Sequence, residues 1–412
     1  MKREQKPVNK PPVAGKHPAQ RIRPGTRAVN REAKNVARPM PQPPARRSLG
    51  QPAAKAAAAR ALSDEQKAEV DRLEREFERL EKQGQLSGIY DDIGKFDSKL
   101  VEYPLTVDSL RARGYVHSGQ LEDQIEALDD KWDAVRPRVE TALQMQVRRL
   151  DSQLNIAERQ VNQMNSLVGI KGAETAVSTL SAQLSAAESA VNGLYQGLEN
   201  ELDRIGSRLN QLSKMLDLYE GAPEIRLYEA EGPLMAVEAE WEQNGDEGPD
   251  GYLFLTDQRL IFEQREEVVT KRRFGIFKAE SEKIQKVLIE VQTHEIEQVS
   301  HKEEGGFLGM GKADILELVF AATASVSRAR FHLKGQDSAD WAAMIKRVQT
   351  GDIDRDRAEE YLEEVESAKV VAASFPTQCP ACFAAVAPPP RGATSVTCEF
   401  CSTVILPQAA NS

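Results

Sequence analysis

The residues best suited to chemistry in this chain are its four cysteines, which all lie in the last tenth of the sequence. They form two matched pairs, Cys379-x2-Cys382 and Cys398-x2-Cys401, separated by fifteen residues. Each C-x-x-C pair is a short knuckle that can place two sulfurs on one metal ion. Two such knuckles at this separation favour a tetrahedral four-cysteine site, so the spacing predicts a structural zinc ion (Zn²⁺).

The cysteines have two competing interpretations. Disulfides would need an oxidising compartment, but the chain shows no secretion signal and the cytosol is reducing. A C-x-x-C redox motif would need a βαβ context, which these residues lack. The pattern resembles a zinc ribbon, in which protein ligands fill all four metal positions and no catalytic water is held. Because residues 373–408 are too short to bury a core of their own, zinc binding would supply most of their folding energy.

A glycine-rich stretch, "GGFLGMGKA", matches most of a phosphate-binding loop through Gly306-x4-Gly311-Lys312. The next residue is Ala313, so the hydroxyl that would hold Mg²⁺ is missing. The following residues, "DILELVF", indicate a strand where a phosphate-binding loop needs a helix. With no hydrolase or Cys/His nucleophile motif elsewhere, we expect a protein that is not an enzyme.

Two predicted loops bring aromatic or apolar side chains together with basic residues or glycines, in "TKRRFGIFKAESEK" and in the glycine-rich stretch. Apolar tips beside basic residues suit an anionic membrane surface. The candidate membrane or partner contacts are Lys271, Arg272, Arg273, Phe274, Phe277, Lys278, Phe307 and Leu308. The alternative is that these side chains pack within their own domain or against the helices.

The residues that must position these loops alternate with a period of two after residue 222. "LMAVEAEWEQ" reads as a strand, and "GYLFLTDQRLIFEQ" reads as a strand, a Thr-Asp turn and a second strand. "KVLIEVQTHEIEQVSHKE", "ILELVF" and "RARFHL" predict three or four more. An amphipathic helix follows in "SADWAAMIKRVQTG", with Asp337 or Ser338 as its cap and Trp341 on its apolar face. Six or seven strands closed by one helix predict a small β-barrel.

The hairpin "GYLFLTDQRLIF" resembles the signature hairpin of GRAM and bacterial pleckstrin-homology-like (PH-like) domains. The resemblance covers about residues 222–352. It implies a barrel that binds membrane lipid or a protein partner without catalysis, with Trp341 facing inward.

The region before the strands is helical in pattern. "LSDEQKAEVDRLEREFERLEKQ" begins with a capping box, Ser63 with Gln66, and ends at Gly84. We expect short helices and turns over residues 85–118, because Gly88, Gly94, Pro104 and Gly114 interrupt them.

Residues 119–220 carry apolar residues at alternating steps of three and four, which predicts a coiled coil or a helical hairpin. Gly169 and Gly172 interrupt the pattern, either as a hairpin turn or as a skip in one rod. Pro137 should kink its helix or mark a boundary. One continuous helix is expected from Ala173 to Tyr219. The apolar seam predicts either a homo-oligomer or an antiparallel bundle within one chain.

Charge is distributed unevenly along the chain. Residues 1–60 hold 15 lysines and arginines against two acids, for a net charge of +13. The rest of the chain then carries -23 of the total of -10. The basic segment also holds 10 of the 21 prolines, so it cannot bury enough apolar surface to fold and is predicted to be disordered. Such an arm suggests an anionic partner or contact with the acidic body.

Together these patterns predict a multidomain protein. The predicted parts are a disordered arm (1–60), a helical segment (61–118), a coiled coil or hairpin (119–220), a PH-like barrel (222–352), a helical linker (353–372) and a zinc ribbon (373–408). With no apolar run near the roughly 20 residues that span a bilayer, we expect a cytoplasmic protein, peripheral at a membrane if the loops bind one.

The predicted function is a non-enzymatic scaffold that docks lipid or protein. The alternative is a nucleic-acid-associated protein using the basic arm and the ribbon, which holds only one basic residue, Arg391, between its outer cysteines.

Overall fold

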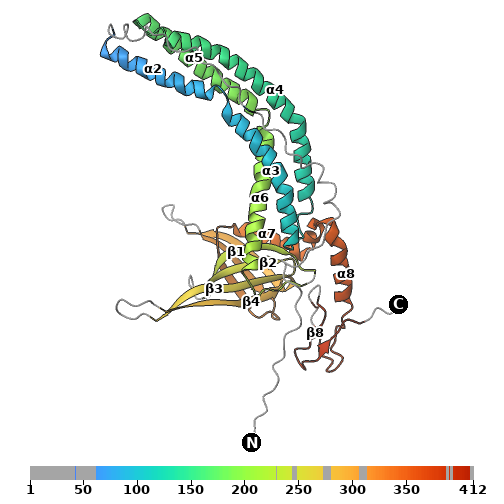
Figure 1. Ribbon diagram of the computed structural model, residues 1–412. Helices are drawn as coiled ribbons and strands as arrows, with labels where there is room; N and C mark the ends of the chain where they lie inside the picture. Colours follow the sequence, from blue (N-terminus) through green and yellow to red (C-terminus); the bar gives the residue numbers. More distant parts are fainter. Residues whose placement is uncertain are drawn as a thin grey trace. The chain divides into compact units, whose positions relative to one another are not determined.

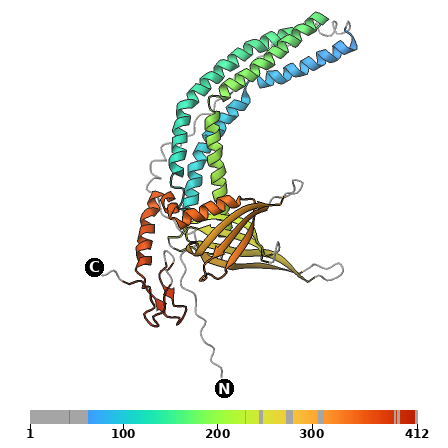
Figure 2. The same ribbon diagram turned by 180° about the vertical axis from the view of Figure 1, so that it is seen from behind.

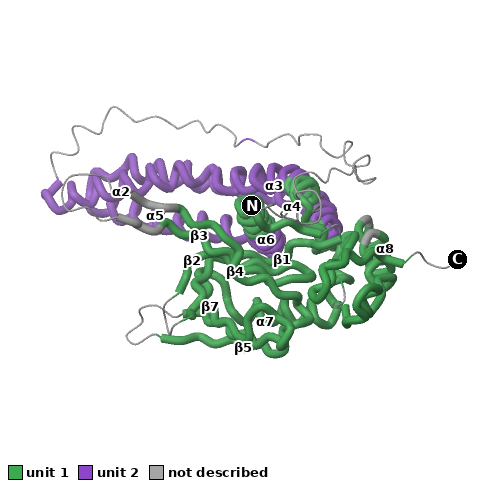
Figure 3. The backbone as a smooth tube through the Cα atoms, turned by 90° about the horizontal axis from the view of Figure 1, so that it is seen from below, with its two compact units in different colours: residues 1–28, 106–121, 209–412 green, residues 29–105, 122–208 purple. Residues whose placement is uncertain are grey.

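The computed structural model describes residues 42, 62–228, 230–243, 248–271, 280–305, 313–386, 389 and 393–408, without the side chains of residues 268–271, 280–282, 360 and 364. The predicted disordered arm therefore lies outside the described residues, apart from Gln42. The chain divides into two compact units, coloured separately in Figure 3. The helical unit comprises residues 29–105 and 122–208, and the second unit comprises residues 1–28, 106–121 and 209–412.

The helices before the sheet are long, and the first begins as its sequence predicts. They are α2 (Asp64–Gln83), α3 (Ser87–Ala112), α4 (Leu121–Val161), α5 (Leu167–Asn192) and α6 (Gln196–Glu220). The Ser63 side chain accepts a hydrogen bond from the backbone N–H of Gln66, and the Gln66 side chain accepts one from the backbone N–H of Ser63. This capping box satisfies N–H groups that have no partner inside the helix. Gly84 ends α2, as predicted.

The apolar seam of residues 119–220 is largely buried within a single chain, as in the predicted intrachain bundle. In α4 and α5 the buried seam residues include Leu143, Leu150, Leu154, Val177, Leu180 and Leu184. Figures 1 and 2 both show α2, α4 and α5 side by side. The turn between α4 and α5 lies at residues 162–166, earlier than Gly169 and Gly172, and Ser166 caps α5. Val168, which continues the sequence pattern, is 81% exposed because it follows this turn.

The helix expected from Ala173 to Tyr219 is interrupted at residues 193–195, between α5 and α6. Tyr195 is buried at this break and meets Trp132 edge-on, with ring centroids 6.4 Å apart. Trp132 stacks on Phe96 at 4.3 Å and donates its indole N–H to Asp97. Burial of three aromatic rings stabilises the interruption, because such rings carry large apolar areas and favour edge-on and offset contacts.

One local expectation for these helices was wrong. Residues 87–112 form one helix, α3, although the glycines and Pro104 predict short pieces. Buried side chains along α3 repeat at helical spacing: Ile93, Phe96, Leu100, Tyr103, Val107 and Leu110. Of the two alternatives for Pro137, a boundary is excluded because Pro137 lies inside α4. In both helices burial of a continuous apolar stripe outweighs the local cost of a proline.

The second unit contains a seven-stranded antiparallel sheet. Its strands are β1 (Pro233–Trp241), β2 (Asp250–Thr256), β3 (Arg259–Lys271), β4 (Glu280–Gln292), β5 (Ile296–Glu304), β6 (Ala313–Phe320) and β7 (Arg328–Lys334). The strand order is β4-β3-β2-β1-β7-β6-β5, so β4 and β5 are the two edges. The sheet is open, and the expectation of a closed barrel was wrong. A short 3-10 turn, η4 (Thr293–Glu295), leads from one edge strand to the other without pairing them.

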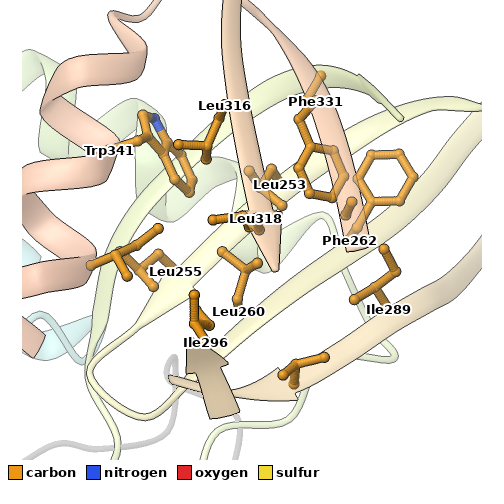
Figure 4. Packing of buried hydrophobic residues seen from close by; sticks show 14 of the residues in the cluster. Leu253, Leu255, Leu260, Phe262, Ile289, Ile296, Leu316, Leu318, Phe331 and Trp341 are labelled. Carbon is orange, nitrogen blue, oxygen red and sulfur yellow. The ribbon is translucent and has the colours of Figure 1, made fainter. Parts of the chain in front are cut away.

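A helix covers the core that the open sheet leaves uncovered. This helix, α7 (Ser338–Gln349), begins at Asp337, whose side chain accepts a hydrogen bond from the N–H of Ala339. It contributes Trp341, Ile345 and Val348 to a cluster that takes residues from all seven strands. Figure 4 shows Trp341 pointing from α7 toward the sheet residues of this cluster, as the sequence predicts. Burial of this aromatic ring shields part of the core from water, as pairing of the edge strands does in a closed barrel.

The remaining elements form the C-terminal part of the second unit. They are η6 (Asp352–Asp356), η7 (Glu359–Tyr361), α8 (Leu362–Ala373), β8 (Val396–Thr397) and β9 (Val404–Ile405). β8 and β9 pair antiparallel as a separate two-stranded sheet. None of the helices in the described ranges has both the length and the apolar character needed to cross a membrane.

The glycines of α6 offer a matched test of close helix approach. A Cβ at Gly206 would lie 2.2 Å from the Tyr103 hydroxyl, which donates to the Leu202 carbonyl, whereas a Cβ at Gly197 meets nothing within 4 Å. Alanine stabilises a helix by roughly 0.5–1 kcal/mol relative to glycine. We therefore expect Gly197→Ala to raise the free energy of unfolding. Gly206→Ala should lower it by about 1–3 kcal/mol through overpacking.

Urea unfolding of the full chain, followed by far-ultraviolet circular dichroism, measures both variants. Equal stabilisation by the two alanines would contradict the close contact between α3 and α6.

Candidate functional site

The four cysteines lie in two knuckles with the same backbone hydrogen bonds. In the first, the N–H of Cys379 donates to the Ala384 carbonyl and the N–H of Phe383 donates to the Cys379 carbonyl. In the second, the N–H of Cys398 donates to the Thr403 carbonyl at 2.9 Å, and the N–H of Ser402 donates to the Cys398 carbonyl at 2.8 Å. The same turn therefore forms around both C-x-x-C pairs.

Each knuckle bends at the residue that follows its second cysteine. Phe383 and Ser402 have φ values of 62° and 58°, in the left-handed region that non-glycine residues seldom adopt. The sequence shows no glycine at either position, so sequence reasoning did not find these bends. They turn the chain back at once, so that Gln378 bridges Ala385 beside the first knuckle and β8 pairs with β9 around the second.

The two knuckles bring all four sulfurs together. The Sγ atoms of Cys379 and Cys401 are 3.6 Å apart, as are those of Cys382 and Cys398, and all four lie within 4.8 Å of one another. A disulfide bond would hold two sulfurs at about 2.05 Å, so none of the cysteines is in a disulfide. Four sulfurs at about 2.3 Å from one zinc ion are about 3.8 Å apart in a tetrahedron. The cluster is therefore compatible with a metal site of this geometry.

Burial divides each knuckle in the same way. The first cysteines, Cys379 and Cys398, are buried at 0% and 3% exposure, and the second cysteines, Cys382 and Cys401, are exposed. Hydrogen bonding to Thr403, first through its side chain and then through its backbone, lowers the pKa of the Cys401 thiol to about 6. The thiolate is the form of cysteine that binds metal.

The apolar core around the cysteines is small. Phe375 and Ile405 are buried with the two inner cysteines, and Ala384, Val386 and Val396 pack against them. We name residues 375–408 the cysteine module. A core of this size cannot offset the entropy cost of ordering some thirty residues, which is about 1–2 kcal/mol for each backbone unit.

The candidate contact loops fall at the ends of two hairpins, mostly outside the described residues. Strands β3 and β4 pair as far as Lys271 and Glu280, and β5 and β6 pair from Ile296 and Phe320 to Glu304 and Ala313. The backbone of Lys271 is described but its side chain is not. The other predicted contacts lie outside the described residues: Arg272, Arg273, Phe274, Phe277, Lys278, Phe307 and Leu308. Their role stays a prediction.

The Thr-Asp-Gln-Arg turn between β2 and β3 is a buried polar centre that sequence reasoning missed. Arg259 forms two hydrogen bonds with the Glu231 carboxylate, from Nε at 2.8 Å and from Nη2 at 2.6 Å. Thr256 donates to the same carboxylate at 2.6 Å, and the N–H of Tyr228 donates to it at 2.8 Å. The Glu231 side chain has no solvent exposure. Its charge is thus held by one cation and several donors, as a buried carboxylate requires.

The next residue of the turn, Asp257, joins two other segments. Its side chain accepts a hydrogen bond from the N–H of Gly232 at 2.9 Å and forms a buried ion pair with Arg357. Arg357 also donates to the Ala230 carbonyl at 2.9 Å. His117 lies beside the pair, with its Nε2 atom 3.7 Å from an Asp257 oxygen. The turn therefore fixes the segment before β1 and the segment after α7 to the sheet.

Electrostatics keep the Arg259 guanidinium charged although burial opposes it. Burial alone lowers the pKa of Arg259, but the charge and hydrogen bonds of Glu231 raise it above its ordinary value. The guanidinium also lies over the Tyr228 ring, 4.4 Å from its centroid. A signal for this centre was present in the sequence, because three polar residues and an arginine stand between two wholly apolar runs. Its buried partner Glu231, about 28 residues earlier, carried no such signal.

No family model matches this chain, and no curated protein matches it. The chain is similar to the N-terminal PH domain of Vps36, at 17% identity over 31% of this chain and 84% of that one, with a TM-score of 0.20. It is also similar to the DH/PH domains of PDZ-RhoGEF in complex with GTP-gamma-S-activated RhoA, at 10% identity over 72% of this chain and 98% of that one, with a TM-score of 0.24. The linker-DH/PH domains of p115-RhoGEF match at 13% identity over 69% and 94%, with a TM-score of 0.20.

The sheet domain has the antiparallel strands and the closing helix with Trp341 that the sequence predicts for a PH-like domain, although its sheet is open.

The buried centre yields a prediction with a matched control. Glu231→Gln removes the buried one of the two carboxylates that pair with Arg259 and should lower the free energy of unfolding by about 3 kcal/mol, because the buried cation then keeps its pair with the exposed Glu290 but loses its buried counterion. Glu238→Gln removes the same charge from an exposed pair with Lys334 and should cost less than about 1 kcal/mol.

Thermal and urea unfolding of the two variants, compared with the parent chain, check this difference. Equal losses would show that Glu231 contributes no more than a surface charge.

Proposed function

We propose that this chain is a non-enzymatic adaptor, in which a PH-like domain docks on membrane lipid or a partner protein and the cysteine module is a structural zinc ribbon. The sulfur geometry carries the proposal. Two sulfur pairs are 3.6 Å apart and all four sulfurs lie within 4.8 Å of one another, which is compatible with a zinc tetrahedron whose edges are about 3.8 Å, and four cysteines would fill every position of it. A filled site has no position for a catalytic water, which supports a structural role.

Zinc would be held by Cys379, Cys382, Cys398 and Cys401, and it would supply the folding energy that the small core lacks. Structural zinc contributes roughly 10–16 kcal/mol of apparent binding energy in comparable small domains. The buried cysteines anchor the metal to Phe375 and Ile405, and the exposed cysteines complete the site from the solvent side. The chain's own residues thus set the shape of both knuckles, and the metal would join them.

The docking role of the PH-like domain is supported by its rigid framework and by the sequence of its hairpin ends. The strand ladders fix where each hairpin ends, while Glu231, Arg259, Asp257 and Arg357 fix the opposite turn of β2 and β3 from within. Binding residues on loops carried by a rigid scaffold are common in proteins. The basic and aromatic stretch at 271–278 resembles a surface suited to anionic lipid. The signature hairpin supports placing the domain with GRAM and bacterial PH-like domains.

A nucleic-acid role receives less support. Residues 375–408 hold one arginine and one glutamate, so the cysteine module brings no net positive charge to a phosphate backbone. Phosphate neutralisation by lysine and arginine supplies most non-specific affinity for nucleic acids. Only the N-terminal arm has that composition.

The zinc proposal predicts one zinc ion per chain in a reduced, untagged preparation. Cys382→Ser should abolish zinc binding and unfold the cysteine module, because three ligands leave a tetrahedral structural site incomplete. The control is Ser402→Ala, which keeps all four sulfurs and should retain the metal. Elemental analysis measures zinc, and proteolysis after residue 374 reports unfolding of the module. A zinc-free parent chain would refute the proposal.

The docking proposal predicts binding of the full chain to vesicles that contain anionic lipid. Arg272→Gln combined with Arg273→Gln should weaken binding by about tenfold or more, since each basic residue contributes about 1 kcal/mol near an anionic surface. The control pair Arg328→Gln and Lys346→Gln removes the same charge from other exposed positions of the domain. Vesicle flotation at low and high salt measures the effect.

If the full chain stays unbound at low salt, the lipid form of the proposal fails and protein docking remains. If both pairs weaken binding equally, the contact does not lie at the β3–β4 hairpin end.

A further inference from the structure

The cysteine module gives each exposed sulfur a buried partner from the other knuckle. Cys382 is exposed, and its sulfur lies 3.6 Å from the sulfur of the buried Cys398. Cys401 is exposed, and its sulfur lies 3.6 Å from that of the buried Cys379. The same pairing of an exposed with a buried cysteine therefore occurs twice between the knuckles, and the chain holds no cysteine outside these two pairs.

An oxidant dissolved in water can reach the two exposed sulfurs. Oxidation of a cysteine depends on its exposure and on its thiolate character. Phe383 and Phe400 are the chain neighbours of these cysteines, but they are 75% and 76% exposed, so neither ring is packed down over a sulfur. Cysteines bind zinc as thiolates. In a zinc-bound module, Cys382 and Cys401 would therefore combine the two properties that favour reaction with a peroxide.

The buried cysteines are placed to complete that reaction. A sulfenic acid, the first product of thiolate oxidation, condenses with a second cysteine to form a disulfide. The two sulfurs of each pair need to approach by about 1.5 Å to reach the bond length of about 2.05 Å. Each exposed cysteine thus has its own partner, and two disulfides would use all four sulfurs.

We propose that the cysteine module is a site of reversible oxidation, at which hydrogen peroxide converts a zinc-bound form into a metal-free form with the disulfides Cys379–Cys401 and Cys382–Cys398. This inference rests on the proposed zinc site. Both disulfides join one knuckle to the other, so they take over the link that the metal would provide. Disulfides within each C-x-x-C pair would leave the knuckles unlinked.

The chemistry balances for each disulfide. The exposed thiolate attacks one oxygen of the peroxide, the O–O bond breaks, and a sulfenic acid and a hydroxide form. The buried thiolate then attacks the sulfenic sulfur, so the S–S bond forms, the S–O bond breaks and a second hydroxide leaves. Two protons from the solvent convert the hydroxides to water. The two electrons that reduce the peroxide come from the two sulfurs, because zinc has no redox chemistry.

Oxidation would release the metal and replace its structural role. Each disulfide removes two thiolates from the zinc ion, so two equivalents of peroxide per chain would release one ion. The apolar core of the module holds only Phe375 and Ile405 beside the two buried cysteines, so a module without any crosslink has little to hold it together. Disulfides between distant positions restrict the unfolded chain and thereby stabilise the folded one.

Treatment of the reduced, zinc-loaded full chain with two equivalents of hydrogen peroxide tests the proposal. A chromogenic chelator measures zinc release, which is expected to reach one ion per chain. Trypsin cuts after Lys369 and Arg391, so each knuckle lies on its own peptide, and these peptides should stay joined without reductant. Cleavage after Glu399 and mass-spectrometric fragmentation before Pro380 then assign the two disulfides. A thiol reductant with added zinc should restore the reduced, metal-bound chain.

A matched pair of variants tests the pairing itself. Cys382→His and Cys401→His each replace an exposed thiol by another zinc ligand, so both can retain the metal. After peroxide treatment, the Cys382→His chain should form Cys379–Cys401 and keep Cys398 unlinked. The Cys401→His chain should form Cys382–Cys398 and keep Cys379 unlinked. If a histidine variant does not bind zinc, the disulfides of the parent chain decide the matter.

Two outcomes in the parent chain overturn the proposal. One is separation of the two tryptic peptides after oxidation, which shows that disulfides formed within each C-x-x-C pair. The other is a chain that keeps its zinc and all four thiols in excess peroxide. Zinc content is measured before oxidation, so failure of the proposed zinc site is recognised separately: a zinc-free chain refutes that site, while its disulfides still test the pairing between knuckles.

Discussion

The sheet domain depends on one buried ion pair, Arg259 with Glu231. The two charges lie out of water and are stable only because each meets the other and several donors or acceptors at once. This requirement fixes the path of the chain, because the segment before β1 must return to the β2–β3 turn to bring Glu231 within hydrogen-bonding distance of Arg259. Asp257 imposes the same requirement on Arg357, after α7. The turn thereby fixes both ends of the domain to its first hairpin.

This constraint gives the signature hairpin a physical meaning. Gly251 begins it because a Cβ there would lie 2.0 Å from the Glu263 carbonyl on the paired strand. Its apolar residues enter the core, and its Thr-Asp-Gln-Arg turn forms the polar centre, which is buried and presents no surface for a ligand. The resemblance to lipid- or protein-binding domains is therefore carried by residues that build the scaffold. Any docking residues must lie elsewhere, which agrees with their expected place at the hairpin ends.

What the sequence predicts well here is local or strictly periodic. The capping box at Ser63, the strands and the inward Trp341 follow from patterns that span a few residues, and the cysteine cluster follows from two repeated spacings. The errors arise where distant contacts decide. The sheet stays open because α7 covers its core, and the helix after Ala173 breaks because Tyr195 packs edge-on against Trp132. In α3 the buried apolar stripe outweighs the glycines and Pro104.

The cysteine module obeys a different constraint from the sheet domain. Its apolar core consists of two side chains and two cysteines, so packing alone cannot select one structure. In each knuckle the same two backbone hydrogen bonds help to position one buried and one exposed sulfur. Phe383, at the first bend, and Phe400, two residues before the second bend, are both exposed. Zinc, as proposed, would let the module tolerate such exposure, because its stability would then not depend on burying those rings.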